Sequence, residues 1–543
     1  MREDLQRSIA TVLSELGIDA APSDVVMERP LRIEHGDWST NAALVYAKLL
    51  GRKPRDLASE ICDKMAGSGL RHLERVEVAG PGFVNFHLSI GWLHDILLDV
   101  ISKGEEGYAR FDFGASERVN LEFVSANPTG PIHVGNGWWG AYGDSLGRVM
   151  ARCGYAVHRE YYVNDTGRQV RMLGESVLAR KFDSEVPDDG YQGEYVSQLA
   201  KSYSGHADAM VAGKWASEMI LEEIKETLAS IGIEYDAWFS QASIEESGAL
   251  DETIDELRVK GLVEERDGAT WFMSHTAGLG DSRDRVLVRS DGTPTYLGGD
   301  LAYHRNKFLV RGFDRVVDIF GADHQGQVAS LKCGMDALGV DTSRLEILIG
   351  QMISLVEGGK SGKMSKRLGN FVSLDELIKD LGSDAVRLLA LMGSLDQAST
   401  LDLDVVRSQS MENPVYYIQY AYARICSLER VREERSIERV PIENVDIDML
   451  SHPRELELLR VLETMPDTVR EACEERAPHK VTAWVRKLAA AFHGFYHDCP
   501  ILFQDPDQDD SALMQARLWL VEACRTTSTI AFSLLGVSAP ERM

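Results

Sequence analysis

The segment Ser125-Ala-Asn-Pro-Thr-Gly-Pro-Ile-His-Val-Gly-Asn136 decides the fold class. It follows a predicted strand, Arg118 to Val124, and leads into a predicted helix. At such a place an α/β sheet binds nucleotides, because exposed N–H groups and the helix dipole attract phosphate. Gly130 and Gly135 let the backbone approach a ligand, and His133 can donate a hydrogen bond to a phosphate oxygen. Taken alone, the segment is also compatible with a plain strand-to-helix turn that carries an incidental histidine.

A lysine-rich segment far downstream, Gly359-Lys-Ser-Gly-Lys-Met-Ser-Lys-Arg367, is the second motif. When a carboxylate attacks the α-phosphate of ATP, catalysis depends mostly on positioning and on stabilising negative charge. Two lysines on a loop bounded by glycines can clamp the leaving phosphates during that step. A lysine-rich loop by itself is usually only solvated. Its position after the first motif, across a region of alternating strands and helices, indicates a nucleotide site.

The chain divides into three predicted regions. Residues 1–110 combine an amphipathic helix with alternating strand-like segments and form a small α+β domain. Residues 116–404 alternate short apolar strands with longer helical patterns, which is typical of a parallel, Rossmann-type sheet. Residues 405–543 show apolar spacings of three and four and predict an all-helical domain. The expected sheet strands are Val119–Val124, Val157–Val163, Val316–Phe320 and Glu346–Ile349.

Composition limits the class of protein further. No run of eighteen apolar residues predicts a membrane span, and the N-terminus lacks the features of a signal peptide. The seven cysteines are scattered without a C-x-x-C pair, which favours reduced thiols in the cytoplasm and no structural metal. The net charge of −27 repels phosphate at long range, so nucleic acid would need a local basic face.

The two motifs resemble those of a known family. His133-Val-Gly-Asn136 is similar to the H-I-G-H motif of class I aminoacyl-tRNA synthetases, and Lys363-Met-Ser-Lys366 resembles their K-M-S-K-S loop. The preceding Ser125-Ala-Asn-Pro-Thr-Gly-Pro is similar to the form in arginyl-tRNA synthetases. One departure is Asn136, which replaces the second histidine and cannot carry a positive charge.

The resemblance implies how the first substrate is bound. A guanidinium group is planar and always charged, so carboxylates in forked pairs hold it best. In the family, matching residues line the arginine pocket. We therefore expect Asp300 and Glu122 to bind the guanidinium and Tyr296 to form a wall. The residues expected to orient the α-amino and carboxylate end, or to form the pocket floor, are Ser125, Asn127 and Gln327.

The resemblance also implies the nucleotide side of the site. We expect His133, Asn136, Lys363 and Lys366 to be catalytic. ATP would bring Mg²⁺ with it. The residues expected to bind ATP are Gly135, Gly321, Asp323, His324, Met364 and Ser365.

The C-terminal region contains the run Glu412-Asn-Pro-Val-Tyr-Tyr-Ile-Gln-Tyr-Ala-Tyr-Ala-Arg424. Tyrosines on a helix are often simply packed in a core, but they can also stack on unpaired bases. The resemblance implies that Tyr417 and Tyr420 lie near the anticodon, and that the N-terminal domain contacts the tRNA elbow.

These observations predict a cytoplasmic, monomeric enzyme that charges tRNA(Arg) with L-arginine, using ATP and requiring bound tRNA. One alternative is a class I synthetase for cysteine, methionine or glutamate; however, zinc ligands are not clustered, and a glutamate pocket would carry arginines at Glu122 and Asp300. A second is a non-catalytic paralogue that binds RNA or a partner, which only Asn136 supports. A third, an unrelated nucleotidyltransferase, would not need the aromatic helical region.

Overall fold

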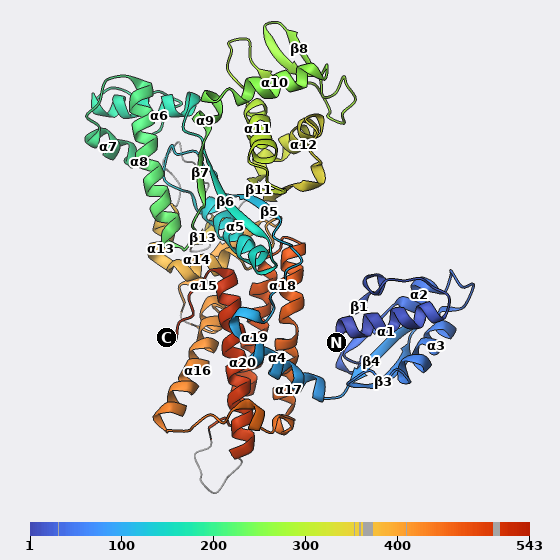
Figure 1. The fold of residues 1–543 in the computed structure, drawn as a ribbon. Coiled ribbons are helices and arrows are strands. Elements are labelled where there is room, and N and C mark those ends of the chain that lie inside the picture. The colour runs from blue at the N-terminus through green and yellow to red at the C-terminus, as the bar shows by residue number, and fades with distance from the viewer. Residues whose placement is uncertain are drawn as a thin grey trace. The chain divides into compact units, whose positions relative to one another are not determined.

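A five-stranded parallel sheet forms the centre of the fold. The computed structural model describes residues 1–30, 32–351, 353–357, 360–361, 373–408, 410–502 and 511–542. Along the sheet the strand order is β12-β11-β5-β6-β7, and every neighbouring pair is parallel (Figure 1). In that order the strands span Leu345–Gly350, Arg315–Gly321, Arg118–Glu122, Ala156–Val163 and Ala237–Ser240. The predicted Rossmann-type sheet is therefore confirmed.

The expected strands are present with small shifts at their ends. The last four residues of β5 are buried, which is typical of a strand covered by helices on both faces. The prediction missed β7 because Ala237–Ser240 is too short to show a periodic pattern. The helix α8 (Ala209–Ser230) begins after Asp208, whose side chain accepts a hydrogen bond from Val211 N at 3.0 Å and caps the helix.

Helices and two small sheets surround the central sheet. An antiparallel sheet has the order β10-β9-β8, and a third sheet has the order β14-β13-β15. These strands span Val263–Arg266 (β8), Ala269–Phe272 (β9), Arg285–Val288 (β10), Ile353–Glu357 (β13), Lys360–Ser361 (β14) and Ser399–Asp402 (β15). The helices are α5 (Val134–Arg152), α6 (Gly167–Lys181), α7 (Glu194–Ser202), α8 (Ala209–Ser230), α9 (Gln241–Glu246), α10 (Ala249–Val259), α11 (Tyr296–Arg305), α12 (Val328–Ala337), α13 (Leu374–Leu381), α14 (Ser383–Ala390) and α15 (Leu403–Val406).

An apolar core fixes the helix that carries the candidate substrate acid. Leu301 of α11 and Leu331 of α12 are almost fully buried, and they belong to one cluster with Val316 of β11 and Leu345 of β12. Burial of such side chains contributes about 1.5–3 kcal/mol each, so the position of α11 over the sheet is well determined. Asp300 precedes Leu301 and therefore takes its place from this packing.

The N-terminal region is the α+β domain that the sequence predicts. Its antiparallel sheet has the order β1-β2-β4-β3, and the strands β3 and β4 flank the Gly80-Pro81-Gly82 turn. The elements are α1 (Arg2–Glu15), β1 (Met27–Glu28), β2 (Trp38–Thr40), α2 (Ala42–Tyr46), α3 (Pro54–Ala66), β3 (Leu73–Ala79), β4 (Phe83–Leu88) and α4 (Gly91–Gly107).

The C-terminal region is helical, as expected. The apolar pattern from Leu456 to Val469 spans two helices. The first helix ends before Thr464, and the second has Pro466 in its first turn. The helices are α16 (Pro414–Glu434), α17 (Pro453–Glu463), α18 (Met465–Glu474), α19 (His479–Asp498) and α20 (Ser511–Leu535).

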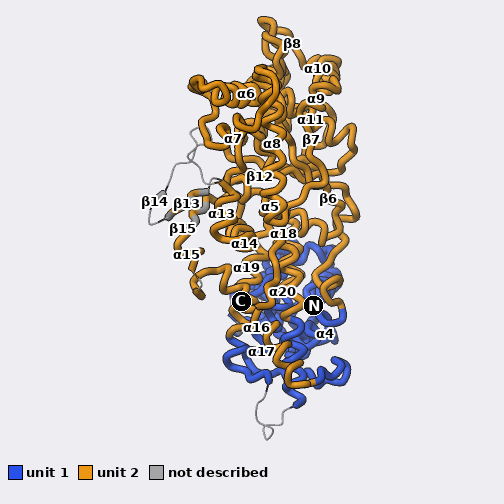
Figure 2. The backbone as a smooth tube through the Cα atoms, turned by 90° about the vertical axis from the view of Figure 1, so that its left-hand side faces the viewer, with its two compact units in different colours: residues 1–102, 438–463, 494–523 blue, residues 103–437, 464–493, 524–543 orange. Residues whose placement is uncertain are grey.

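The chain forms two compact units (Figure 2). One contains residues 1–102, 438–463 and 494–523, and inside it His94 Nδ1 lies 2.8 Å from the Asp448 carboxylate. The other contains residues 103–437, 464–493 and 524–543 and includes the central sheet. The expected three-domain boundaries stay a prediction. Among the described residues, no helix is long and apolar enough to cross a membrane.

Candidate active site

The first motif forms a constrained turn between β5 and α5. Val124 and Ser125 both have a positive φ, 71° and 40°, which is uncommon for any residue with a side chain and rare for a β-branched one. Ser125 Oγ donates to Glu122 Oε1 at 2.8 Å and accepts from Tyr162 N at 3.0 Å. These two hydrogen bonds hold the turn in its strained conformation. Asn127, further along the turn, donates from Nδ2 to Gln169 Oε1 at 2.7 Å.

The helix that follows, α5, is capped by the histidine of the first motif. His133 is the N-cap of α5, and its Nδ1 accepts from Gly135 N at 2.9 Å. In the neutral ring this places the proton on Nε2. Asn136 lies in the first turn of the same helix and is partly exposed. The turn therefore presents a histidine donor and a helix N-terminus at the carboxyl end of the sheet.

The segment that follows the second motif in the chain is bonded to the first motif. Lys363, Met364, Ser365 and Lys366 lie outside the described residues. Ser373, which follows them, pairs with His133 in an antiparallel bridge, and Leu374 N donates to Ile132 O at 2.9 Å. The described chain that resumes at Ser373, six positions after Arg367, is thus bonded directly to the first motif.

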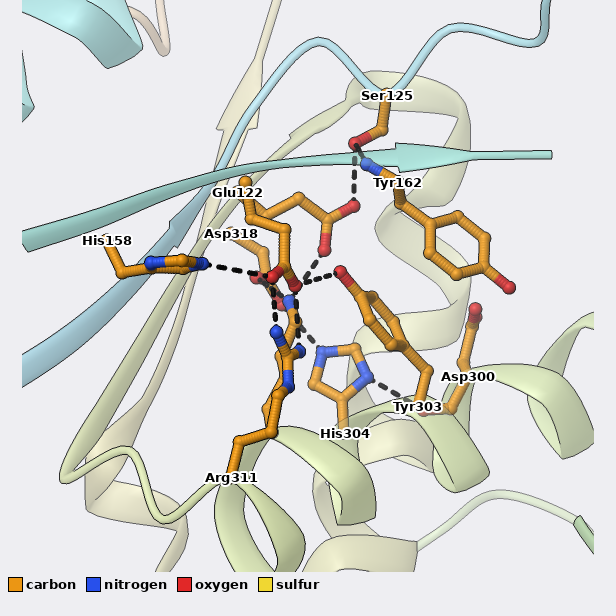
Figure 3. A network of polar contacts seen from close by, with 11 residues as sticks. Glu122, Ser125, His158, Tyr162, Asp300, Tyr303, His304, Arg311 and Asp318 are labelled. Carbon is orange, nitrogen blue, oxygen red and sulfur yellow. Dashed lines mark hydrogen bonds and ion pairs between the residues drawn. The ribbon is translucent and has the colours of Figure 1, made fainter. Parts of the chain in front are cut away.

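A buried lysine organises the acids beneath the turn (Figure 3). Lys307 Nζ lies 2.6 Å from Glu122 Oε2 and 2.8 Å from Asp318 Oδ1, and the lysine is fully buried. His304 Nε2 lies 2.7 Å from Asp318 Oδ2. The charges around Lys307 raise its pKa against the opposing effect of burial. Glu122, expected to bind the guanidinium, therefore has both carboxylate oxygens bonded within the protein.

A second carboxylate in this network is held by arginine and tyrosine. Arg311 binds Glu160 through both terminal nitrogens, and Tyr303 donates its hydroxyl hydrogen to Glu160 Oε1 at 2.5 Å. His158 Nε2 lies 3.5 Å from Glu160 Oε2. Burial opposes ionisation of Glu160, but these partners hold its pKa well below the usual range.

Asp300 differs from the other acids. Its carboxylate has no hydrogen bond or ion pair among the residues that the structure describes, and it points toward the hydroxyl end of Tyr162 (Figure 3). Its backbone carbonyl, in contrast, lies 2.7 Å from His304 Nδ1. Burial raises the pKa of Asp300 to about 6, and the nearby Glu122 charge adds to the rise. A carboxylate that is desolvated and unpaired is ready to receive a cation.

Two more of the residues expected in the arginine pocket line the same cavity. Tyr296 and Gln327 both line a cavity of about 190 Å³, and Tyr296 is 62% exposed. Arg285 and Arg289 line the same cavity. Arg285 is neutralised by Asp281, with N–O distances of 2.8 and 2.9 Å. The structure thus brings Tyr296 and Gln327 together beside two cations.

The residues expected to border adenosine lie at the end of β11. Gly321 is its last residue, and Asp323 and His324 follow on an exposed turn, 3.6 Å apart between Oδ2 and Nε2. The adjacent strand β12 ends at Gly350, which pairs with Gly321. These residues lie at the carboxyl ends of parallel strands, where α/β sheets bind ligands.

A partly exposed aromatic group lies on α16. Arg424 lies over the ring of Tyr420 at 4.4 Å, and Tyr416 and Tyr420 are stacked with centroids 5.6 Å apart. Tyr417 contacts the ring of His493 at 4.9 Å. Tyr422, from the same run, is buried against Phe532 and belongs to the core.

Comparison with known proteins decides the family. The chain is 41% identical to arginine–tRNA ligase of Moorella thermoacetica, covering 98% of this chain and 96% of that protein. It is 39% identical to arginine–tRNA ligase of Bacillus subtilis, covering 100% and 99%. The chain belongs to the arginine–tRNA ligase family.

Three stretches of this arginine–tRNA ligase family member match models of known domains. Residues 3–88 match the arginyl tRNA synthetase N terminal domain, residues 215–394 the catalytic domain of class I (R) tRNA synthetases, and residues 418–543 the DALR anticodon binding domain. The fold is shared with the arginyl-tRNA synthetase of Thermus thermophilus, at a TM-score of 0.80 and 21% identity over 100% of both chains. The chain is thus a class I aminoacyl-tRNA synthetase, an ATP-dependent ligase, and the resemblance seen in the motifs is confirmed.

Sequence reasoning missed Lys307, Tyr303 and Glu160 in this family member. Tyr303 and Lys307 follow Asp300 by three and seven positions, a spacing that the sequence shows. However, nothing in a single sequence shows that Lys307 is buried or which acids it meets. Asp165, shortly after β6, accepts hydrogen bonds from Ser240 Oγ at 2.5 Å and Ala242 N at 3.0 Å, which is a structural turn contact.

A Tyr303→Phe substitution is expected to lower the free energy of unfolding by about 1.5–3 kcal/mol, because a buried hydrogen bond to an ionised carboxylate is lost. Thermal and urea unfolding of the purified protein would measure it. Tyr296→Phe is the matched control, since that hydroxyl belongs to a side chain that is 62% exposed. Equal destabilisation by both substitutions would contradict the proposed contribution of the Tyr303–Glu160 bond.

Proposed function

We propose that the chain activates L-arginine with ATP to arginyl-adenylate and transfers the arginyl group to the 3′ end of tRNA(Arg). The arginine carboxylate oxygen attacks the α-phosphorus, the bond to the β-phosphate oxygen breaks, and pyrophosphate leaves. A terminal tRNA hydroxyl then attacks the arginyl carbonyl, and AMP leaves. The observation that carries the choice of amino acid is the unpaired, half-buried Asp300 carboxylate at the carboxyl end of the sheet.

Asp300 is the principal guanidinium partner in this proposal. Its carboxylate lacks a partner among the described residues, and a cation there would offset its desolvation. Glu122 is the second acid: each of its oxygens is already bonded once, but a carboxylate can accept about four hydrogen bonds. Tyr296 forms a wall, and Ser125, Asn127 and Gln327 orient the α-amino and carboxylate end. Asn127 and Ser125 are supported by the bonds that fix their side chains.

The nucleotide side of the proposal rests on the helix N-terminus. His133 and Asn136 contact the phosphates, Gly135 lets the chain approach them closely, and the α5 dipole attracts negative charge. Gly321, Asp323 and His324 border the adenosine. Lys363 and Lys366, with Met364 and Ser365, neutralise charge on the leaving pyrophosphate. Mg²⁺ would be held mainly by phosphate oxygens, where it neutralises charge.

For RNA, Tyr417 and Tyr420 are proposed to contact the anticodon loop. Both are partly exposed on α16, and aromatic rings stack on unpaired bases. Arg424, over the Tyr420 ring, adds a positive charge to this part of a strongly acidic protein. The N-terminal domain is proposed to contact the tRNA elbow. We also propose three domains with boundaries near residues 110 and 405, a monomer, and a cytoplasmic location.

The test is ATP–pyrophosphate exchange with each of the twenty amino acids, with and without total tRNA. Exchange with arginine alone, and only when tRNA is present, is the expected result. Exchange with a different amino acid would refute the substrate assignment. Loss of all exchange in a folded protein that still binds tRNA would favour the non-catalytic alternative and make Asn136 its cause.

Arginine affinity should depend on pH through Asp300. Its pKa of about 6 means that the carboxylate is charged above pH 6 and protonated below. Each pH unit below 6 should therefore raise the KM for arginine by about tenfold, whereas above pH 7 the KM should be flat. The KM for ATP, measured in the same exchange assay, is the control. A KM for arginine that stays constant from pH 5 to 8 would contradict the role of Asp300.

A further inference from the structure

A tryptophan lies directly against the ends of two central strands. β11 and β12 end at Gly321 and Gly350, which are paired in the sheet. A Cβ atom added at Gly350 would lie 2.4 Å from Trp139 Nε1, and one at Gly321 would lie 2.9 Å from Trp139 Cη2. Both distances are shorter than any real contact of a Cβ atom. The indole can occupy this place only because both strands end in glycine.

Trp139 lies beside the proposed nucleotide site. It stands on α5 one turn after Asn136, so the same helix carries the proposed phosphate contacts and the indole. The strand ends beneath it border the proposed adenosine site, and Asp323 Oδ1 lies 2.6 Å from the same added Cβ at Gly321. Trp138, the next residue back, is only 7% exposed, whereas Trp139 is partly exposed.

The indole of Trp139 has a polar group without a partner among the described residues. Its indole N–H has no hydrogen-bond acceptor in the part of the chain that the structure describes. An indole offers a large flat π surface, and purine bases stack on such surfaces whatever their edge groups. A purine at the strand ends would cover this surface and remove it from water.

We propose that Trp139 is a nucleobase-stacking residue that positions the adenine of ATP for the activation step. This deepens the proposed function and rests on it. Stacking fixes the plane of the base, and the length of the nucleotide then brings the α-phosphate toward the His133 end of α5. Stacking does not read the edge of the base, so Trp139 supplies affinity and orientation and leaves the choice of adenine to other groups.

A Trp139→Ala substitution tests the proposal. It should raise the KM for ATP roughly 10- to 100-fold in arginine-dependent exchange, while kcat and the KM for arginine change little. Trp139→Phe should restore most of the loss, since a phenyl ring still stacks. An unchanged or lowered KM for ATP in Trp139→Ala would overturn the proposal, because the indole would then only fill or block the site.

A direct binding measurement separates this proposal from the proposed function. Intrinsic fluorescence of the wild-type protein should be quenched by AMP, and Trp139→Phe should lose most of that quenching. Trp271→Phe is the matched control, because Trp271 is also partly exposed but lies on β9 in another sheet. Quenching that survives in Trp139→Phe would refute stacking even if arginine exchange is normal. Quenching that is lost in a protein without arginine exchange would refute only the proposed function.

A double substitution tests the contact with the strand end. Gly350→Ala should displace the indole and raise the KM for ATP, because the three atoms nearest to its methyl group all belong to Trp139. In a Trp139→Ala background the same substitution should have no further effect. Additive effects would mean that the methyl group obstructs ATP itself, and the indole would then not be the element that glycine accommodates.

Discussion

An Asp300→Asn variant is expected to bind arginine roughly 100-fold more weakly than the wild type, because a desolvated charge pair with the guanidinium is lost. Asparagine keeps the size of the side chain but removes its charge, so the packing of α11 should persist. The KM for ATP should change by less than about threefold, since the nucleotide does not contact this carboxylate in the proposed site. Exchange kinetics at varied arginine and varied ATP measure both constants.

Asp251→Asn provides the matched control for this substitution. Asp251 is exposed on α10 and has the same chemistry, so its amide should leave both constants unchanged. If Asp300→Asn weakens arginine and ATP equally, the carboxylate is structural and the guanidinium is bound elsewhere. In that case Glu122 becomes the principal candidate.

A Lys366→Ala variant is expected to exchange pyrophosphate about 100- to 1,000-fold more slowly than the wild type, with little change in the KM for arginine. The reason is that charge on the leaving phosphates develops in the transition state, where the lysine would act. Rapid-quench measurement of arginyl-adenylate formation, with tRNA present, resolves this step from transfer.

Lys379→Ala removes the same charge from a nearby exposed site. Lys379 lies on α13, shortly after the second motif, and pairs with Asp375 at 2.5 Å. It should leave the rate unchanged within about a factor of two, as expected for a surface ion pair. A wild-type rate in Lys366→Ala would remove the second motif from the mechanism.

The sequence predicted the parallel sheet and the family because local patterns carry both. Apolar runs marked β5, β6, β11 and β12, and two short motifs carried the family resemblance. Alternating strands and helices require a parallel sheet whichever way the chain continues. The four residues of β7 carry no such pattern, so that edge of the sheet was invisible.

Pairing within the site could not be predicted, because it depends on residues distant in the chain. Glu122 was expected to face the substrate, but its carboxylate meets Lys307, which comes 185 positions later. Tyr296 and Gln327 line one cavity, yet the two arginines that share it come from β10 and the turn after it. Spacing in a single sequence shows which residues can meet and leaves open which of them do.

The network beneath the first motif has an uneven charge when its carboxylate, lysine and arginine side chains are counted. It contains more carboxylates than cations, so one positive charge from outside brings it closer to balance. In the proposed site the substrate guanidinium supplies this positive charge, and arginine binding would then thermodynamically link the folded state to arginine concentration. Selectivity for arginine and stabilisation of the fold by arginine would then have the same cause, because a neutral amino acid would leave the charge imbalance in place. The carboxylates are Glu122, Glu160, Asp300 and Asp318, and the cations are Lys307 and Arg311.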